Sequence, residues 1–138
     1  MNRNVVSVAD VMTGSVRTIG RMDTVAQAIE AMRESGVSSL VVERRNPADE
    51  FGLITIADIA REVIARDRPA ERVNVYEVMA KPVLSLPQEM QTKYAVRLLV
   101  RFGLSRALVV DVSRIPVGIV TLRDMVLHLG ATAPGRGR

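Results

Sequence analysis

The sequence predicts a mixed α/β (α+β) fold, built from two copies of one β-α-β-β-α unit. Three observations predict it. Landmarks recur along the chain at an offset of 66 to 67 residues, each copy carries one amphipathic helical stripe, and each stripe is followed by two short apolar strands. A repeat at a fixed period indicates that one structural unit is used more than once.

The internal repeat relates residues 8–19, VADVMTGSVRTI, to residues 75–86, VYEVMAKPVLSL. Met12 and Met79 occupy equivalent places, 67 residues apart. Several landmarks in the same order indicate a duplicated unit rather than a chance match. We therefore expect repeat 1 with its lead-in and linker at residues 1–70, repeat 2 at 71–130, and a disordered tail at 131–138.

A brief strand opens each copy, at residues 15–19 and 83–86, and an amphipathic helix follows it. In repeat 1, Asp23 or Thr24 can cap the helix and Gly36 can end it in the left-handed region. The equivalent glycine in repeat 2 is Gly103. Apolar residues at helical spacing form the stripe, namely Val25, Ala28, Ile29 and Met32 in repeat 1 and Ala95, Val96, Leu99 and Phe102 in repeat 2.

Two strands come next in each copy, at residues 37–43 and 51–56 and at residues 107–112 and 117–122. Their consecutive apolar residues are typical of strands covered on both faces. We expect the two sheets to pack against each other around a pseudo-two-fold axis, with the helices outside. A last helix is expected to begin near Asp58 in repeat 1 and near Asp124 in repeat 2.

Composition narrows the class of protein. The 138 residues are 48% hydrophobic and 3% aromatic, so the core must be aliphatic. There is no cysteine, which excludes disulfides and thiol chemistry, and no apolar run reaches the roughly 20 residues that span a bilayer. We expect a cytoplasmic protein. The net charge of +4 comes from repeat 2 and the tail, where it is scattered and could attract any anion.

The doubled pattern resembles a tandem pair of cystathionine-β-synthase (CBS) domains, also called a Bateman module. The resemblance rests on the ordered motifs DVMT, DTVAQAIEAM, GVSSLVVE and GLITIADI and on their second copies, from about residue 6 to residue 129. It implies a stand-alone regulatory pair without catalytic activity, two clefts between the halves, and a homodimer. It also implies an adenosine-containing ligand: AMP, ADP, ATP or S-adenosylmethionine. No cofactor is required.

A Thr-x-x-Asp motif ends the last strand of each copy, as Thr55 with Asp58 and as Thr121 with Asp124. An ionised carboxylate has two acceptor oxygens, which suit the two hydroxyls of a ribose, and a threonine hydroxyl can bind ribose or phosphate. The same spacing is also typical of a helix N-cap, so capping stays open as a second interpretation. In the family that the chain resembles, the two positions hold the nucleoside.

The resemblance also implies the other walls of the clefts. Cleft 1 would combine Thr121 and Asp124 with Thr13, Val16, Val37 and Ser38. Cleft 2 would combine Thr55 and Asp58 with Lys81, Val83, Leu104 and Ser105. The valines and the leucine are equally compatible with an ordinary core. Arg106 and Arg123 are the candidates for phosphate contact, because a guanidinium fork suits phosphate oxygens.

Other chemistry is not supported. His128 is the single histidine, so no zinc site can be built, and we expect it to be structural. The chain has no Walker loop and no nucleophile elbow. Asp49 and Glu50 lie in a polar loop and are interpreted as solvated. The alternatives to adenine-nucleotide sensing are a ligand-free protein interaction module, an S-adenosylmethionine or NAD(H) binder, and a nucleic-acid binder, which lacks aromatic stacking platforms.

Overall fold

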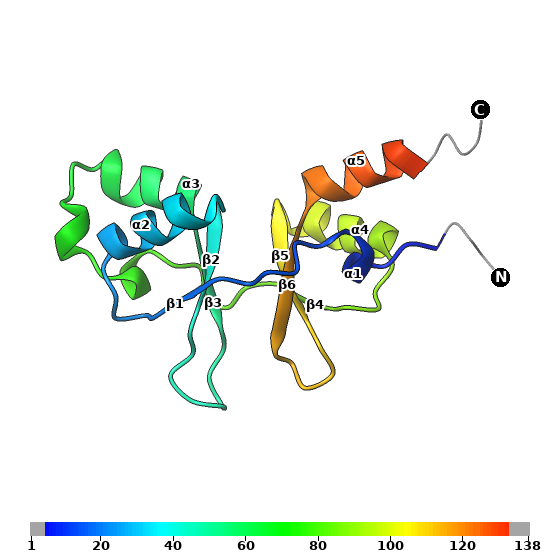
Figure 1. The fold of residues 1–138 in the computed structure, drawn as a ribbon, viewed down its shortest axis with the longest axis horizontal. Coiled ribbons are helices and arrows are strands. Elements are labelled where there is room, and N and C mark those ends of the chain that lie inside the picture. The colour runs from blue at the N-terminus through cyan, green and yellow to red at the C-terminus, as the bar shows by residue number, and fades with distance from the viewer. Residues whose placement is uncertain (1–4, 133–138) are drawn as a thin grey trace. The chain divides into compact units, whose positions relative to one another are not determined.

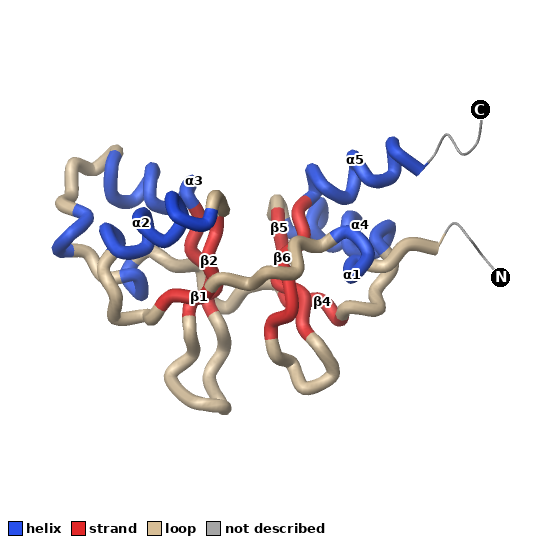
Figure 2. Tube along the Cα trace, viewed as in Figure 1, coloured by secondary structure: helices blue, strands red, loops and turns tan. Residues whose placement is uncertain are grey.

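The computed structural model describes residues 5–132 of the chain. Its contacts divide the chain into two compact units (Figure 1). Unit 2 is the continuous segment Arg17–Val83, and unit 1 joins the N-terminal segment up to Val16 to the residues from Leu84 onward. Each unit contains one three-stranded sheet and its own helices (Figure 2). The predicted mixture of helices and strands in two copies is confirmed.

Unit 2 contains strands β1 (Thr18–Ile19), β2 (Ser39–Val42) and β3 (Gly52–Thr55), in the order β1-β2-β3. β1 runs parallel to β2, and β3 runs antiparallel to it. Helix α2 (Val25–Ser35) precedes β2, and α3 (Ile56–Ile59) follows β3 and continues as a π-helix through Ala60–Ile64. Two 3₁₀ turns, Ala70–Arg72 and Val75–Glu77, complete the unit.

Unit 1 repeats this plan. Strands β4 (Ser85–Pro87), β5 (Arg106–Val110) and β6 (Pro116–Thr121) form a sheet in which β4 is parallel and β6 antiparallel to β5. Helix α4 (Thr92–Phe102) precedes β5, and α5 (Leu122–Thr132) follows β6. The short helix α1 (Val8–Val11) belongs to this unit too. Residues 131 and 132 of the predicted disordered tail thus end a helix, and the rest of that tail lies outside the described residues.

The lead-in of each repeat packs on the other repeat, which is why the compact units differ from the sequence repeats. In unit 1, Val8 N donates to Met90 O and Thr92 N donates to Val6 O, both at 2.8 Å. In unit 2, Val75 N donates to Asp23 O and Val25 N donates to Val73 O, again at 2.8 Å. These atoms correspond residue by residue across the repeat. The duplication therefore includes the exchange of lead-ins.

A methionine and a glycine bring each lead-in close to its sheet. A Cβ atom on Gly52 would lie 2.8 Å from Met79 Sδ, and one on Gly118 would clash with Met12 Sδ and lie 2.8 Å from Thr13 O. Thr13 and Ile119 exchange two backbone hydrogen bonds, and so do Ala80 and Leu53. The absence of a side chain at each glycine lets the lead-in sit directly on the strand.

Each unit has an aliphatic core between its helices and its sheet. In unit 2 the core joins α2, β2, β3 and the π-helix through residues such as Met32, Leu40, Ile54 and Val63. In unit 1 it joins α1, α4, β5 and β6 through Val8, Leu99, Val109 and Val120. All four positions of β2 are buried, as the apolar run predicts. The packing of one sheet on the other stays a prediction.

Two predicted details are wrong for local reasons. Phe102, assigned to the apolar stripe of α4, is 57% exposed, because it is the last residue of the helix before Gly103 turns the chain at a φ of 65°. The strand predicted at residues 107–112 ends at Val110, because the Asp111 carboxylate accepts hydrogen bonds from Ser113 N and Ile115 N and starts a turn. The helix ends at Gly36 and Gly103 are confirmed.

Candidate functional site

The first Thr-x-x-Asp motif forms a corner between β3 and α3. Thr55 is the N-cap residue: its Oγ1 accepts from Asp58 N, and Asp58 Oδ2 accepts from Thr55 N, both at 3.1 Å. This reciprocal pair is a capping box, so the capping interpretation holds at this corner. The other carboxylate oxygen, Oδ1, accepts from Arg61 Nη2 at 2.8 Å. Both oxygens of Asp58 therefore have donors within the chain.

The second corner, between β6 and α5, also has a threonine hydroxyl, but the arginine beside its aspartate is placed differently. Thr121 Oγ1 accepts from Asp124 N at 3.0 Å. Arg123 Nη1 lies 3.5 Å from Asp124 Oδ1. The side chain of Asp124 is 36% exposed, whereas that of Asp58 is 16% exposed. The carboxylate of Asp124 is thus the more open to solvent.

The strand beside each corner differs between the repeats. Arg106 is the register partner of Thr121 across β5 and β6, and Ser39 is the partner of Thr55 across β2 and β3. Directly opposed residues of an antiparallel pair point to the same face, with Cβ atoms about 5 Å apart. Arg106 therefore stands on the same face as the Thr121 hydroxyl. The second corner can offer a guanidinium where the first offers a serine.

The lead-ins bring further predicted residues to the corners. Thr13 bonds through its backbone to Ile119, two residues before Thr121, and Val16 ends the same segment of unit 1. Ser105 O accepts from Leu122 N, which places Ser105 and the preceding Leu104 beside the second corner. These contacts place Leu104 and Ser105 in the same unit as Asp124, and their role in the cleft of Asp58 stays a prediction.

The first corner is arranged in the same way. Ser38 O accepts from Ile56 N, so Ser38 and the preceding Val37 lie in the unit that contains Thr55. Lys81 and Val83 follow Ala80, whose backbone is bonded to Leu53. Ala80 stands where repeat 1 has Thr13, so this corner has one hydroxyl fewer. Whether Val37 and Ser38 serve Asp124, and Leu104 and Ser105 serve Asp58, stays a prediction.

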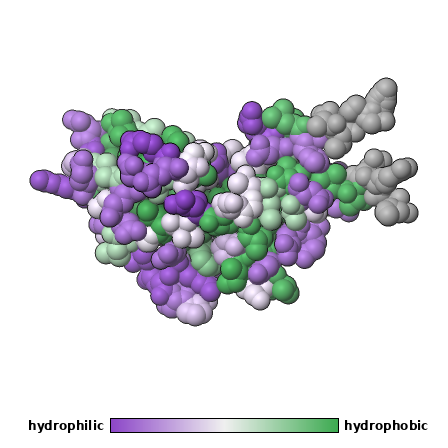
Figure 3. Space-filling view, in the orientation of Figure 1, coloured by the Kyte–Doolittle hydropathy of each residue, from purple (hydrophilic) through white to green (hydrophobic). Residues whose placement is uncertain are grey.

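Lys81 has a partner that the sequence did not predict. Its Nζ donates to Asp49 Oδ2 at 2.8 Å, and Arg45 donates to the same oxygen through its backbone N and its Nε. These donors, Lys81 first, hold the pKa of Asp49 far below its usual value. The side chain of Asp49 is only 8% exposed, so its interpretation as a solvated loop residue is wrong. Figure 3 shows hydrophilic residues gathered over the loop between β2 and β3, at the lower edge of the view.

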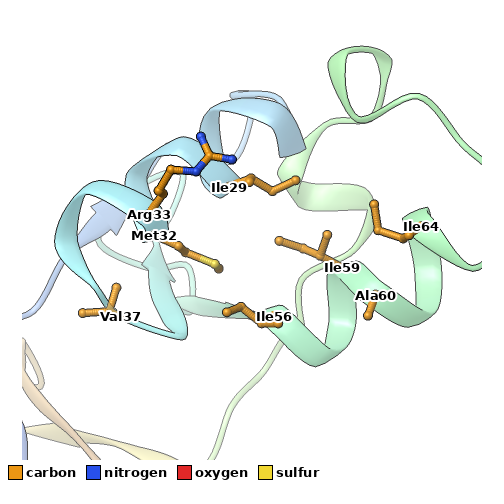
Figure 4. A pocket seen from close by; sticks show the side chains of 8 residues that line it. All are labelled: Ile29, Met32, Arg33, Val37, Ile56, Ile59, Ala60 and Ile64. Atoms are coloured by element: carbon orange, nitrogen blue, oxygen red, sulfur yellow. The ribbon is translucent and has the colours of Figure 1, made fainter.

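An apolar cavity of about 310 Å³ lies in unit 2 between α2 and the α3 segment (Figure 4). Met32 and Ile59 form its floor, Arg33 is its single charged lining residue, and the exposed Ile56 and Ile64 stand at its edge. No carboxylate or hydroxyl lines it, so it does not offer the polar groups that recognise a nucleoside.

No group of three or more histidine, cysteine, aspartate or glutamate side chains within residues 5–132 could hold a metal ion. In the same part of the chain, no helix combines the length and the apolar character needed to cross a membrane.

Comparison with known proteins identifies the family. The CBS domain model matches residues 8–65 and 75–131, so the chain belongs to the CBS domain family. An uncharacterized protein from Methanopyrus kandleri is 32% identical over 122 residues, which cover 88% of this chain and 61% of that protein. L-aspartate semialdehyde sulfurtransferase from Methanosarcina acetivorans is 32% identical over 116 residues, 83% of this chain and 22% of the enzyme. The chain thus spans less than two thirds of either relative.

Solved structures agree with this assignment. A hexameric CBS-CP12 protein from bloom-forming cyanobacteria superposes with a TM-score of 0.87 at 31% identity, over 97% of this chain and 76% of that one. A CBS domain pair in complex with 5′-methylthioadenosine and S-adenosyl-L-methionine has a TM-score of 0.77 at 21% identity, over 93% of this chain and 98% of that one. The resemblance seen in the sequence is therefore confirmed as family membership.

Proposed function

We propose that this CBS pair is a regulatory module that binds an adenosine-containing ligand, such as AMP, ADP, ATP or S-adenosylmethionine, and catalyses no reaction. The observation that carries the proposal is the corner at the end of β6, where the Thr121 hydroxyl caps the turn that presents Asp124. The complex of another CBS pair with 5′-methylthioadenosine and S-adenosyl-L-methionine supports the ligand class.

The chemistry of the corner suits a nucleoside. A carboxylate can accept from the 2′- and 3′-hydroxyls together, and its negative charge strengthens both hydrogen bonds. A phosphate would find positive charge nearby, on Arg106 across the strand pair and on Arg123 beside Asp124. Lys81 is a weaker phosphate candidate, because Asp49 already occupies its ammonium group.

The proposed output is a change in conformation or assembly. A ligand shifts an equilibrium only as far as it binds one state better than another. Accordingly, the module would report ligand level to a partner that recognises one state. We place it in the cytoplasm, since a chain without cysteine gains nothing from an oxidising compartment.

We further propose that two copies of the chain associate through their apolar helical faces. Ile56 and Ile64 are exposed beside the cavity of unit 2, and Val100 and Val126 are exposed on α4 and α5 of unit 1. Large exposed apolar side chains that gather on helices are typical of an interface. The hexameric relative supports self-association. Sedimentation equilibrium measures the mass, and a monomer at every concentration would refute this part of the proposal.

The ligand hypothesis is tested by calorimetric titration with AMP, ATP, S-adenosylmethionine, 5′-methylthioadenosine and NADH. We expect at least one adenosine compound to bind, and Asp124→Asn to weaken it by about 1.5–3 kcal/mol, the scale of a charged hydrogen bond. Glu89→Gln is the control, because it removes one exposed negative charge from unit 1 away from the corner. If none of the compounds binds at millimolar concentration, the ligand-free interaction module becomes the better explanation.

A further inference from the structure

We propose that the two corners are unequal, and that Arg61 acts as an internal occupant of the Asp58 corner and so leaves Asp124 as the principal ribose acceptor. This inference rests on the proposed function and makes it more specific. It concerns which of two similar sites is filled, and it identifies Arg61 as the residue that sets the difference.

Side chains of the following helical turn contact the Asp58 carboxylate and each other. Arg61 Nη2 donates to Oδ1 at 2.8 Å, and the same guanidinium donates through Nε to Glu62 Oε2 at 3.1 Å. The second contact braces the arginine in the position that the first one needs. Because Thr55 N already donates to Oδ2, a ribose at this corner would compete with two internal donors for the acceptor sites of the carboxylate.

A leucine replaces Arg61 in repeat 2. Residues 66 positions apart are equivalent here, and the equivalent of Arg61 is Leu127. Leu127 is 54% exposed and has no group that can donate to a carboxylate. Leu127 therefore cannot hold Asp124 in the way that Arg61 holds Asp58.

The ion pair between Arg123 and Asp124 is weak. Arg123 Nη1 lies 3.5 Å from Oδ1, beyond the usual range of an N–H···O hydrogen bond, and the arginine side chain is 78% exposed. A long, solvated ion pair of this kind contributes little. Arg123 can therefore turn toward a phosphate without a large loss, and Asp124 can accept from a diol.

The size of the effect follows from the strength of such pairs. Breaking an exposed ion pair weakens binding by about two- to fivefold. Arg61 therefore biases the choice between the corners rather than excluding Asp58 absolutely. The hydroxyl that Ala80 lacks relative to Thr13 adds to the same bias.

The test exchanges the two matched residues. Arg61→Leu gives repeat 1 the side chain of repeat 2, and Leu127→Arg does the reverse. Adenosine is the probe because it is uncharged. The charge of an added or removed arginine then has little direct effect on binding, and a change in affinity reports the competition for the carboxylate. Both positions are largely exposed, so the fold should tolerate either change. Equilibrium dialysis with labelled adenosine gives the affinity and the number of molecules bound per chain.

We expect the wild type to bind adenosine about two- to fivefold more tightly at one corner than at the other, Arg61→Leu to bring the two affinities together, and Leu127→Arg to weaken the tighter site two- to fivefold. Arg33→Leu is the control, because the exposed Arg33 of the same unit pairs with Glu30 and with no residue of a corner, and it should bind as the wild type does. Two equal sites in the wild type, or unchanged affinity in Leu127→Arg, would overturn the inference and leave the proposed function standing. Absence of any adenosine binding, together with no response to the charged compounds, would overturn both.

Discussion

Unit 2 and unit 1 are built on one plan, yet they use their polar side chains differently. In unit 2, Asp58 is held by Arg61 and Asp49 by Lys81, so both carboxylates are occupied by cations of the same unit. In unit 1, the contact between Asp124 and Arg123 is long, at 3.5 Å, and Leu127 stands where repeat 1 has Arg61. The comparison indicates that duplication preserved the backbone of the corner, while one copy was stabilised internally and the other kept its carboxylate exposed.

The largest difference between the units should appear when a side chain is added at the glycine where each lead-in contacts its sheet. Gly118→Ala should destabilise the protein by about 2–3 kcal/mol and Gly52→Ala by about 1 kcal/mol. A Cβ at either glycine would meet a flexible methionine sulfur, but at Gly118 it would also lie 2.8 Å from the backbone oxygen of Thr13, whereas at Gly52 the equivalent oxygen of Ala80 is 3.3 Å away. Urea unfolding of both variants measures the difference. Equal losses would mean that the two lead-ins are held equally tightly.

A smaller effect should come from the helix caps. Thr24 caps α2 with a capping box, and its Oγ1 accepts from Gln27 N at 3.1 Å, whereas Gln91 makes no side-chain cap at α4. Thr24→Ala should therefore cost about 1 kcal/mol of stability and Gln91→Ala only a few tenths. Gln91→Thr should stabilise α4. Thermal unfolding compares the three variants, and no gain in Gln91→Thr would show that α4 is capped by other means.

The smallest effect should be a dependence of the free energy of unfolding on pH, which arises from Asp49 in unit 2. Lys81 and Arg45 lower the pKa of Asp49 in the folded protein, so the carboxylate adds stability above its unfolded pKa of about 4. That contribution declines as the pH falls further toward the folded pKa, because only the unfolded chain then binds the proton. Asp49→Asn should thus lose stability at pH 7 and lose less at pH 3.

Denaturant midpoints at both pH values measure this dependence. Glu50→Gln is the matched control, since Glu50 is the exposed neighbour of Asp49 in the same loop. A gap between wild type and Asp49→Asn that stays constant with pH would contradict the role assigned to the Lys81 pair.

The sequence predicted the elements well, because local rules determined them. The stripes of α2 and α4 follow helical spacing, and Gly36 and Gly103 end them as left-handed residues with φ near 66° (67° and 65°). The Thr-x-x-Asp corners were predicted from the same local pattern. Two details were missed because local features compete there. Phe102 has the spacing of a buried residue but lies at the end of α4, next to Gly103. The apolar pattern of β5 could continue past Val110, but the Asp111 side chain forms a turn instead.

Contacts that join distant segments were harder to predict. Asp49 and Lys81 are 32 residues apart, and no pattern in the sequence pairs a loop carboxylate with that lysine. Arg61 lies only three residues from Asp58, and a spacing of i and i+3 is a signal that could have indicated their pairing. The asymmetry between the repeats was thus partly visible in the sequence, as arginine against leucine at equivalent positions.

The exchange of lead-ins has a consequence for the order in which the molecule can form during synthesis. Unit 2 is one uninterrupted stretch, Arg17–Val83, and every residue of it has left the ribosome once Val83 has emerged. Unit 1 begins earlier and ends later, so α1 must wait without its partners until α4 and β6 have been translated. Because domains fold as they are completed, the corner that contains Asp58 should be finished before Asp124 has been added to the chain.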